Sequence, residues 1–392
     1  MKEIHILGGG FAGVWAAMSA AAERNSASAE MIRIALVSKT PDLIIRPRLY
    51  QGASQALSVP LAPLMKEIGV DFRVAEVGKI DAEARRYRCS GGEECEYDRL
   101  ILATGSKLKH LPISGMQEYT WSIDNFEDTE RLDFHLDQLD QLDPNDPAEN
   151  TIVIIGAGFT GLELATELRS RLGDKKRIIL VDQAEQSGND LGATFLPFIE
   201  EAVAVCGIET HLGTTVSCIW PGAIKLSNGK LIESRTVIMA TGLVASPLTR
   251  SISGEHDAQG RLKVTPDLKV PGTESIFVAG DTAHAFADAN HATLLSCQHA
   301  TELGRFAGYN AVHDLLGNEL QVYRQPFYAT CIDLGEWGAV FSTGWERKVE
   351  KVRDEGKAIK MQINNEWIMP PDPALGKLKI FEKVALAIEV EI

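Results

Sequence analysis

Short apolar runs alternate with stretches of helical periodicity over the first three quarters of the chain. Residues 4–7 form such a run before an alanine-rich stretch at about 11–23, and residues 151–155 form another before a leucine-rich stretch at 159–172. A buried strand that leads directly into a helix is the building unit of α/β folds with parallel sheets. The pattern therefore predicts an α/β protein in which this strand–helix unit occurs twice.

The elements expected after each opening unit follow a similar order. In the first unit residues 40–66 are predicted to be loop and short helix, and the further strands are 32–37, 71–80 and 98–103. In the second unit the expected elements are strands at 177–182, around 208–232 and at 235–240, with a helix near 194–206. Ala-Thr-Gly follows in both units, at 103–105 and 240–242, which indicates an internal duplication.

The segments outside these units carry weaker patterns. Residues 124–150 are acidic, and leucines at helical spacing predict a solvated surface helix there, at Leu132, Leu136, Leu139 and Leu142. A turn at 143–147 closes this helix. Beyond the second unit we expect a strand at 275–281 and a helix over about 290–316. The last quarter is expected to be β-like at 327–334, 339–343 and 357–363, with a helix from about residue 377.

Both strand–helix junctions carry the pattern G-x-G-x-x-G, at 8–13 and at 156–161. A strand that turns tightly into a helix presents backbone N–H groups and the positive end of the helix dipole to a pyrophosphate. One such pattern is weak evidence, but two in the same context predict two dinucleotides bound at once. The pair points to a flavin-dependent enzyme that uses a pyridine nucleotide.

The residues after the second pattern indicate which coenzyme it takes. Asp182 ends the next predicted strand, where a carboxylate can accept both hydroxyls of an adenosine ribose. Its neighbours at 183–185 supply no cation for a 2′-phosphate, which favours NADH over NADPH. Glu163 follows the glycine turn and either orients the nicotinamide amide or only stabilises the first helical turn.

The first pattern departs from this plan, because its next strand ends in Ser38 and Lys39 instead of an acid. Ser38 can still donate to or accept from a ribose hydroxyl, but more weakly than a carboxylate. The departure weakens that one contact and leaves the predicted pyrophosphate cradle in place.

The amino-acid composition indicates which partners and which cellular compartment suit the protein. The chain has 39 Lys and Arg against 54 Asp and Glu, a net charge of −15, which excludes nucleic acid and opposes broad attraction to anionic lipid. We see no signal peptide and no apolar stretch of roughly 20 residues, the length that a membrane span needs. The six cysteines show no C-x-x-C spacing, which fits a reducing cytoplasm and a mechanism without a disulfide relay.

The order of these motifs, completed by Gly280 and Asp281, resembles the two-dinucleotide-binding flavoproteins of the glutathione-reductase type. Within that superfamily the chain is most similar to type II NADH dehydrogenases, on the stretches 46–51, 240–248 and 297–300. The resemblance implies FAD in an outer domain made of 1–115 and 250–320, and NADH in an inserted domain at 116–249. It leaves 321–392 as a small C-terminal α+β domain on the acceptor side or at a homodimer interface.

The same resemblance implies a role for individual residues. The expected FAD contacts are Gly8, Gly10, Phe11, Ala12, Gly13, Ser38, Lys39, Arg48, Val77, Ala103, Thr104, Gly105, Gly280, Asp281, Gln298 and His299. The expected NADH contacts are Gly156, Gly158, Phe159, Thr160, Gly161, Glu163, Asp182, Thr241 and Gly242. Glu163 and Gln298 are the expected catalytic residues, with Gln298 beside the flavin ring where a quinone enters.

Two departures from the family pattern bear on the acceptor. Glu302 and Leu303 stand where the group carries a further glutamine pair, and residues 377–392 have little of the basic character of its amphipathic membrane anchor. Both departures argue against a quinone, whereas the resemblance implies a quinone or similar small acceptor, which we expect here. We also expect a cytoplasmic location, with peripheral contact at the inner face of the membrane left open. The alternatives are a reductase of a ferredoxin-like protein, which the net charge opposes, and a redox-sensing flavoprotein of the apoptosis-inducing-factor type.

Some conspicuous side chains have plainer explanations. The spacing of His284, His291, Cys297 and His299 matches no zinc pattern, so we expect no metal. For Cys297 we expect the role of a small packing residue, and a redox-active thiol is the alternative. The tryptophans of the last quarter are expected in core packing, with the acceptor side or a dimer interface as alternatives: Trp337, Trp345 and Trp367.

Overall fold

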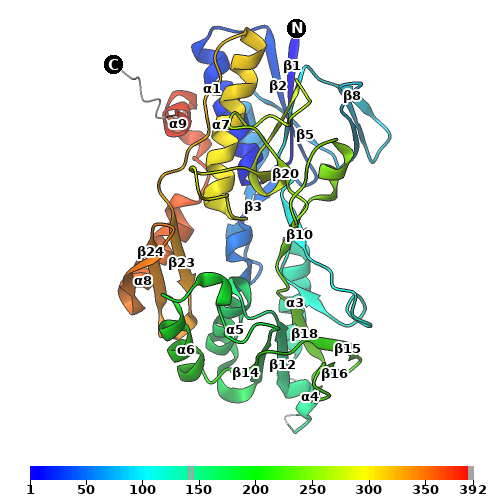
Figure 1. Ribbon diagram of the computed structural model, residues 1–392, viewed down its shortest axis with the longest axis vertical. Coiled ribbons are helices and arrows are strands. Elements are labelled where there is room, and N and C mark those ends of the chain that lie inside the picture. Colours follow the sequence, from blue (N-terminus) through cyan, green and yellow to red (C-terminus); the bar gives the residue numbers. More distant parts are fainter. Residues whose placement is uncertain (140–142, 144, 387–392) are drawn as a thin grey trace.

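The computed structural model describes residues 1–139, 143 and 145–386. Two parallel five-stranded sheets lie at the two ends of the molecule (Figure 1). The first sheet has the order β21-β9-β1-β2-β5, with β1 (Lys2–Leu7), β2 (Ile32–Ser38), β5 (Asp71–Val74), β9 (Arg99–Leu102) and β21 (Ile276–Val278). The second has the order β11-β18-β12-β13-β14, with β11 (Trp121–Ser122), β12 (Thr151–Ile155), β13 (Arg177–Val181), β14 (Glu209–His211) and β18 (Thr236–Met239).

The two sheets share one arrangement. In each, the strand before the glycine pattern is central and pairs in parallel with the next long strand, Lys2 opposite Ile32 and Thr151 opposite Arg177. All five residues of β12 are buried, because helices cover one face of its sheet and a small antiparallel sheet the other. The predicted α/β fold with two Rossmann-like sheets is confirmed.

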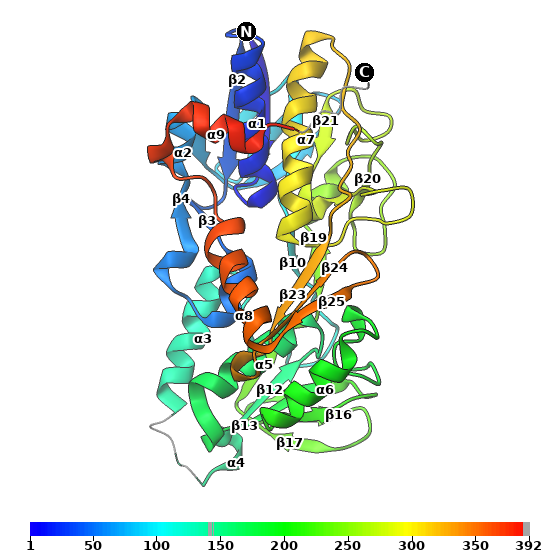
Figure 2. The ribbon, with the colours of Figure 1, turned by 90° about the vertical axis from the view of Figure 1, so that its left-hand side faces the viewer.

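Helices α1 (Phe11–Ser26) and α7 (Cys297–Leu316) lie side by side against the first sheet (Figure 2). A Cβ placed on Gly304 would lie 2.2 Å from the carbonyl oxygen of Ala12, and one on Gly308 would lie 2.3 Å from that of Ala16. The two backbones therefore touch, which only glycine at these positions of α7 allows.

The other helices and small sheets surround these layers. The remaining helices are α2 (Leu61–Glu67), α3 (Phe126–Gln138), α4 (Pro147–Asn150), α5 (Phe159–Leu172), α6 (Leu196–Val205), α8 (Arg353–Gln362) and α9 (Lys377–Val384). The three-stranded sheets are β6 (Val77–Asp81), β7 (Arg86–Cys89) and β8 (Glu94–Glu96); β15 (Val216–Trp220), β16 (Ala223–Leu226) and β17 (Leu231–Glu233); and β23 (Ala329–Asp333), β24 (Ala339–Thr343) and β25 (Lys348–Val352). The strand pairs are β3 (Asp42–Ile44) with β4 (Ser58–Pro60), β10 (Ser106–Leu108) with β19 (Leu243–Ala245), and β20 (Leu262–Lys263) with β22 (Ala283–His284).

Several predicted elements differ from the structure. The strand expected at 71–80 is two strands, because β5 pairs with β2 whereas β6 pairs with β7 in another sheet. The segment 208–232 likewise contains four strands, β14 to β17. Helix α7 begins at Cys297 instead of near 290, because the Ser296 hydroxyl caps it by accepting from the His299 backbone N at 3.2 Å. Leu142, the last leucine of the predicted acidic helix, lies outside the described residues.

The β-like prediction for 357–363 was wrong, because this segment belongs to α8 and the turn after it. The buried residues of α8 and of the turn after it are spaced by four, at Gly356, Lys360 and Asn364, which places them on one face of the helix. A Cβ on Gly356 would lie 2.3 Å from the carbonyl oxygen of Ala339, so α8 packs directly on β24. The predictions for 327–334, 339–343 and the helix from 377 match β23, β24 and α9.

Candidate functional site

A single large cavity of about 2260 Å³ connects the two glycine patterns. Its walls include Gly10 and Phe11 from the first pattern and Phe159 and Thr160 from the second. The volume is well above the roughly 300–1,000 Å³ of a pocket for one drug-sized ligand. The cavity therefore has room for more than one large ligand between the two sheets.

The first glycine pattern forms a tight turn with open space at its centre. Gly8 has a φ of +117°, and a Cβ on it would lie 2.2 Å from the Ala103 carbonyl oxygen. A Cβ on Gly13 would lie 1.7 Å from the Gly8 carbonyl oxygen, whereas one on Gly10 would meet no described atom within 4 Å. The free N–H groups at the start of α1 and the space beside Gly10 fit a dinucleotide pyrophosphate.

The second pattern repeats this geometry and adds a carboxylate. Gly156 also has a φ of +117°, and a Cβ on it would lie 2.2 Å from the Ala240 carbonyl oxygen. The Asp182 carboxylate accepts from the backbone N of Ala157 at 2.7 Å and of Ala184 at 2.8 Å. These bonds fix the carboxylate at the end of β13, beside the glycine turn, where an adenosine ribose would need it.

The Gly280–Asp281 turn reaches the same cavity from the end of β21 in the first sheet. Asp281 accepts from the Ser106 hydroxyl at 2.6 Å, and burial raises the pKa of its carboxyl group. Arg46 donates to the Ser106 carbonyl oxygen at 3.2 Å and pairs with Asp124 at 2.6 Å. This chain of polar contacts ties the turn to the β10–β19 connection between the two sheets.

Glu163 is buried in the cavity wall with a partner that the sequence did not indicate. The residue is 3% exposed, and its carboxylate accepts from the Lys360 ammonium at 2.8 Å and from the Asp333 backbone N at 3.0 Å. Burial raises the pKa of Glu163 to about 7, although the charge of Lys360 opposes that rise. A carboxyl group that titrates near neutrality on a cavity wall is suited to accept and release a proton.

Further charged groups connect this pair with the surface. The Asp333 carboxylate accepts from the Tyr50 hydroxyl at 2.9 Å and also pairs with Lys357. The Lys357 side chain is 32% exposed, whereas Asp333 is buried. Polar groups therefore run from the cavity wall at Glu163 to solvent at Lys357.

Gln298 and Cys297 line the cavity at the start of α7. The Gln298 side-chain oxygen accepts from the Ala329 backbone N at 3.3 Å, which leaves its amide nitrogen for a ligand. Burial raises the pKa of Cys297 to about 11 and that of Cys331 to about 12, so both thiols are protonated at neutral pH. Neither cysteine has the low thiol pKa of a redox-active residue.

His299 lies behind the cavity wall. It is fully buried, its Nδ1 lies 2.8 Å from the Gln325 side-chain oxygen, and it stacks on Tyr328 and Trp345. Burial lowers the pKa of His299, which keeps the ring neutral. Its expected contact with FAD is therefore not a direct one in this arrangement, because only its neighbours Gln298 and Ala300 line the cavity.

The other predicted contacts divide into two groups. The first and third residues of both Ala-Thr-Gly stretches line the cavity, at Ala103, Gly105, Ala240 and Gly242, whereas Thr104 does not. Ser38 lies against the glycine loop at Gly9. Thr241 lies next to this wall and donates to the Lys109 carbonyl oxygen at 2.7 Å. Among the described residues, those placed elsewhere are Arg48, which donates to the Asn364 carbonyl oxygen at 3.2 Å, Lys39, which pairs with Glu76 at 3.0 Å, and Val77, which opens β6.

The histidines and tryptophans that the sequence singled out have different surroundings. His284 contacts Asp257 at 3.2 Å and His291 contacts Asp288 at 2.8 Å, and the described part of the chain holds no cluster of three metal-ligating side chains. Trp337 is buried under Arg353 and Trp345 belongs to the stack on His299, whereas Trp367 is half-exposed at the cavity.

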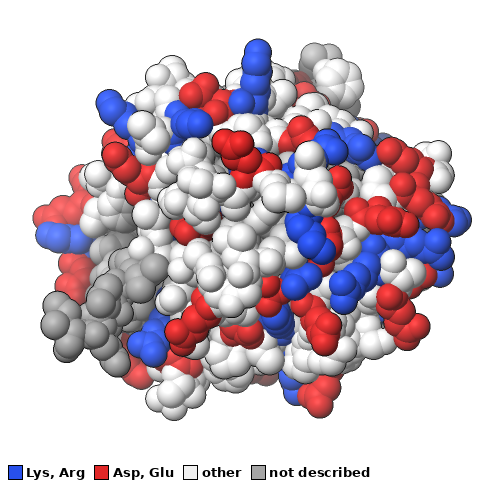
Figure 3. All heavy atoms as spheres, turned by 90° about the horizontal axis from the view of Figure 1, so that it is seen from above, with Lys and Arg blue, Asp and Glu red and all other residues white. Residues whose placement is uncertain are grey.

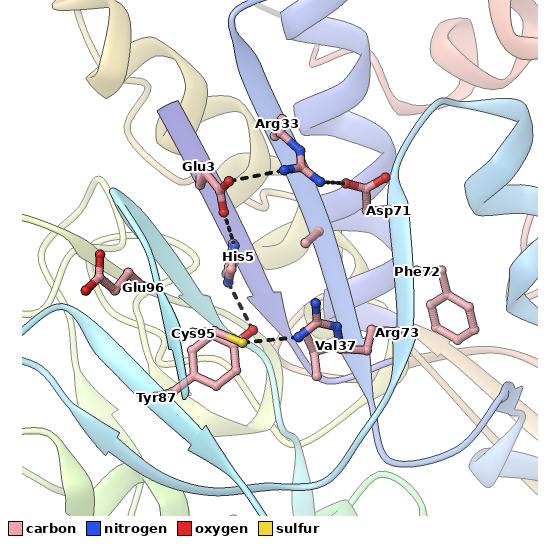
Figure 4. A pocket seen from close by; sticks show the side chains of 11 residues that line it. Glu3, His5, Arg33, Val37, Asp71, Phe72, Arg73, Tyr87, Cys95 and Glu96 are labelled. Atoms are coloured by element: carbon pink, nitrogen blue, oxygen red, sulfur yellow. Dashed lines mark hydrogen bonds and ion pairs between the residues drawn. The ribbon is translucent and has the colours of Figure 1, made fainter. Parts of the chain in front are cut away.

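A smaller cavity of about 340 Å³ shares no lining residue with the large one (Figure 4). Most of its charged groups pair with one another: Glu3 lies 2.9 Å from His5, and Arg33 lies 2.7 Å from Asp71. We assign this cavity no role, because most of its charges are already paired. At the top of the molecule both signs of charge are interspersed around uncharged residues, without a basic face (Figure 3).

Two strand–turn–helix cradles around one cavity define a protein that binds two dinucleotides. The chain belongs to the pyridine nucleotide-disulphide oxidoreductase family, whose model matches residues 2–303. It is 38% identical over 381 residues to an NADH dehydrogenase-like protein of Mycobacterium tuberculosis, covering 95% of both chains. It is 28% identical over 355 residues to a demethylphylloquinone reductase of Synechocystis, covering 86% of both.

Solved structures share the fold. NDH2 from Plasmodium falciparum in complex with NADH superimposes with a TM-score of 0.79 at 13% identity, over 97% of this chain and 98% of that one. Family membership, together with the two cradles, indicates that the protein binds FAD and NADH. Within the described residues we find no helix with the length and apolar character needed to cross a bilayer.

Proposed function

We propose that the protein oxidises NADH through FAD and passes the electrons to a quinone or a similar small acceptor. The observation that carries this proposal is the single cavity that joins both glycine cradles and continues to Gln298, Glu163 and Lys360. Relatives named type II NADH:quinone oxidoreductase, such as that of Staphylococcus epidermidis at 27% identity over 361 residues, support the quinone-type acceptor.

In this proposal the first cradle, with Asp281, holds FAD in the domain made of 1–115 and 250–320. The second cradle, with Asp182, holds NADH in the domain at 116–249. When bound, FAD supplies an acceptor for the hydride of NADH and a donor of two electrons. The chain itself positions the two ligands in one cavity and limits the access of water.

The reaction requires a proton that the coenzyme does not supply. Reduction of a quinone to a quinol takes two electrons and two protons, and hydride loss from NADH provides both electrons and one proton. We propose that Glu163 and Lys360 hold the second proton at the cavity wall, and that Asp333 and Lys357 return one from solvent. The pKa of Glu163 near 7 matches that task.

We also propose that the protein is cytoplasmic and contacts the membrane peripherally when it exchanges a lipophilic acceptor. Three large apolar side chains at the cavity are more than half exposed, Phe286, Phe327 and Trp367. Flotation with lipid vesicles tests this, and recovery of all the protein in the unbound fraction would contradict it. A homodimer built on 321–392 stays a prediction that light scattering can test.

Acceptor profiling tests the proposed function. The purified protein, reconstituted with FAD, is mixed with NADH and then with a water-soluble quinone in a stopped-flow spectrometer. We expect rapid loss of the flavin absorbance and rapid recovery when the quinone is added. A long-lived broad band at long wavelength without reoxidation would instead indicate a redox sensor, and reoxidation only by a ferredoxin would indicate a protein acceptor.

A further inference from the structure

The two glycine cradles have the same backbone but differ at the position meant for the pyrophosphate. Gly8 and Gly156 share a φ of +117°, and a Cβ on either would lie 2.2 Å from a carbonyl oxygen of the neighbouring strand. A Cβ on Gly10 would meet no described atom within 4 Å. One on Gly158, the matching residue, would lie 3.0 to 3.3 Å from the carboxylate of Asp190.

Asp190 therefore fills the space that the second glycine of the pattern leaves open. Its carboxylate accepts from the Phe159 backbone N at 3.3 Å, at the first residue of α5. This is where a helix N-terminus binds an anion and where the pattern brings the backbone close to a pyrophosphate. A carboxylate and a pyrophosphate cannot both occupy it, because both are anionic.

The backbone that carries Asp190 is held in place, whereas its side chain is exposed. Gly188 donates to the Ala157 carbonyl oxygen at 2.7 Å, and Leu191 is 2% exposed. Arg347, from the C-terminal domain, donates to the Asp190 carbonyl oxygen at 2.6 Å. The side chain can therefore rotate away from α5 without moving the loop.

We propose that Asp190 is a built-in substitute for the coenzyme pyrophosphate. It satisfies the N-terminus of α5 when NADH is absent and has to turn away when NADH binds, so it weakens the binding of NADH and speeds its release. The open first cradle carries no such competitor and keeps its dinucleotide. The inference rests on the proposed NADH site at the second cradle.

The test uses the full-length protein loaded with FAD and measures dissociation constants by titration calorimetry. Asp190→Asn keeps the shape of the side chain and removes its charge. We expect it to lower the Kd of NADH and of ADP-ribose by about three- to thirty-fold, the range of a charge at a helix terminus. The Kd of adenosine, which has no pyrophosphate, should stay the same.

Asp174→Asn is the matched control, because Asp174 is an exposed acid just beyond the opposite end of α5. It should leave all three dissociation constants unchanged. Asp190→Ala, which also removes the capping oxygen, should likewise lower the Kd of NADH and of ADP-ribose. An equal or higher Kd of ADP-ribose in both Asp190 variants would overturn the role of Asp190. Wild-type protein that binds neither NADH nor ADP-ribose would contradict the coenzyme site itself.

Discussion

Replacement of Lys360 by methionine would leave the carboxylate of Glu163 alone in the cavity wall. Lys360 supplies the 2.8 Å ion pair with Glu163, and the remaining bond, from the Asp333 backbone N, carries no full charge. Methionine has a similar length without the charge, so the packing of α8 against β24 should persist. The expected consequence is a higher pKa of Glu163 and a loss of stability that depends on pH.

The magnitude follows from the burial of Glu163. Its pKa rises from the ordinary 4.5 to about 7 with Lys360 present, which corresponds to about 3 kcal/mol against ionisation. Because the folded pKa exceeds the unfolded one, the free energy of unfolding falls as pH rises from 4.5 to about 7 and then levels off. Without Lys360 the pKa of Glu163 rises further, so this fall should continue above pH 7 at about 1.4 kcal/mol per pH unit. At about pH 8 the loss relative to wild type should therefore be about 1.4 kcal/mol larger than at low pH. At about pH 5.5, where Glu163 is protonated, the difference should be about 1 kcal/mol or less.

Urea unfolding of the FAD-loaded protein, followed by tryptophan fluorescence at the two pH values, measures these differences. The double variant Glu163→Gln/Lys360→Met has no charge at this pair and serves as the control, because this pair should contribute no pH dependence to its stability. The reasoning would be refuted if Lys360→Met lost the same stability at both pH values, or if the double variant kept the pH dependence.

Three further predictions concern the two cradles and the thiol. Asp182→Asn should raise the Kd of NADH about ten-fold by weakening the ribose contacts, with FAD content unchanged; an unchanged Kd in calorimetry would refute the assigned contact. Gly156→Ala should lose NADH binding and keep FAD, and Gly8→Ala should lose FAD, because each added Cβ would lie 2.2 Å from a carbonyl oxygen. Flavin absorbance per protein measures the bound FAD, and titration with NADH measures the binding of NADH. If Gly156→Ala lost FAD and Gly8→Ala lost NADH binding, the roles that we give to the two cradles would have to be exchanged. Cys297→Ser should change turnover by less than about two-fold, because the thiol with a pKa of about 11 is protonated; a loss of activity would indicate a redox thiol.

The features that the sequence predicted well are those with a local physical cause. A glycine at positive φ between a strand and a helix is encoded within six residues, so both cradles could be located from the pattern alone. The two roles predicted for Glu163, to orient the nicotinamide amide or to stabilise the first helical turn, followed from its position just after the glycine turn. Neither role involves Lys360. Lys360 is 197 residues away and reaches Glu163 only because α8 packs on β24.

The misassignment of 357–363 explains why that partner was missed. Read as a strand, the segment offers no reason to bury a lysine, whereas the four-residue spacing of Gly356, Lys360 and Asn364 on a helix places one beside the cavity. Asp190 was missed for a related reason. No sequence pattern marks an acid in a loop as a partner of a helix N-terminus. Asp190 lies beside the start of α5 only because its loop folds back over the glycine turn.

The central claim, that electrons pass from NADH to FAD in this cavity, is tested most directly by one anaerobic titration. Protein loaded with FAD is titrated with NADH while the visible flavin absorbance is recorded. The account predicts that one equivalent of NADH per bound FAD removes that absorbance. Protein that fails to retain FAD, or bound FAD that keeps its absorbance in excess NADH, would contradict it.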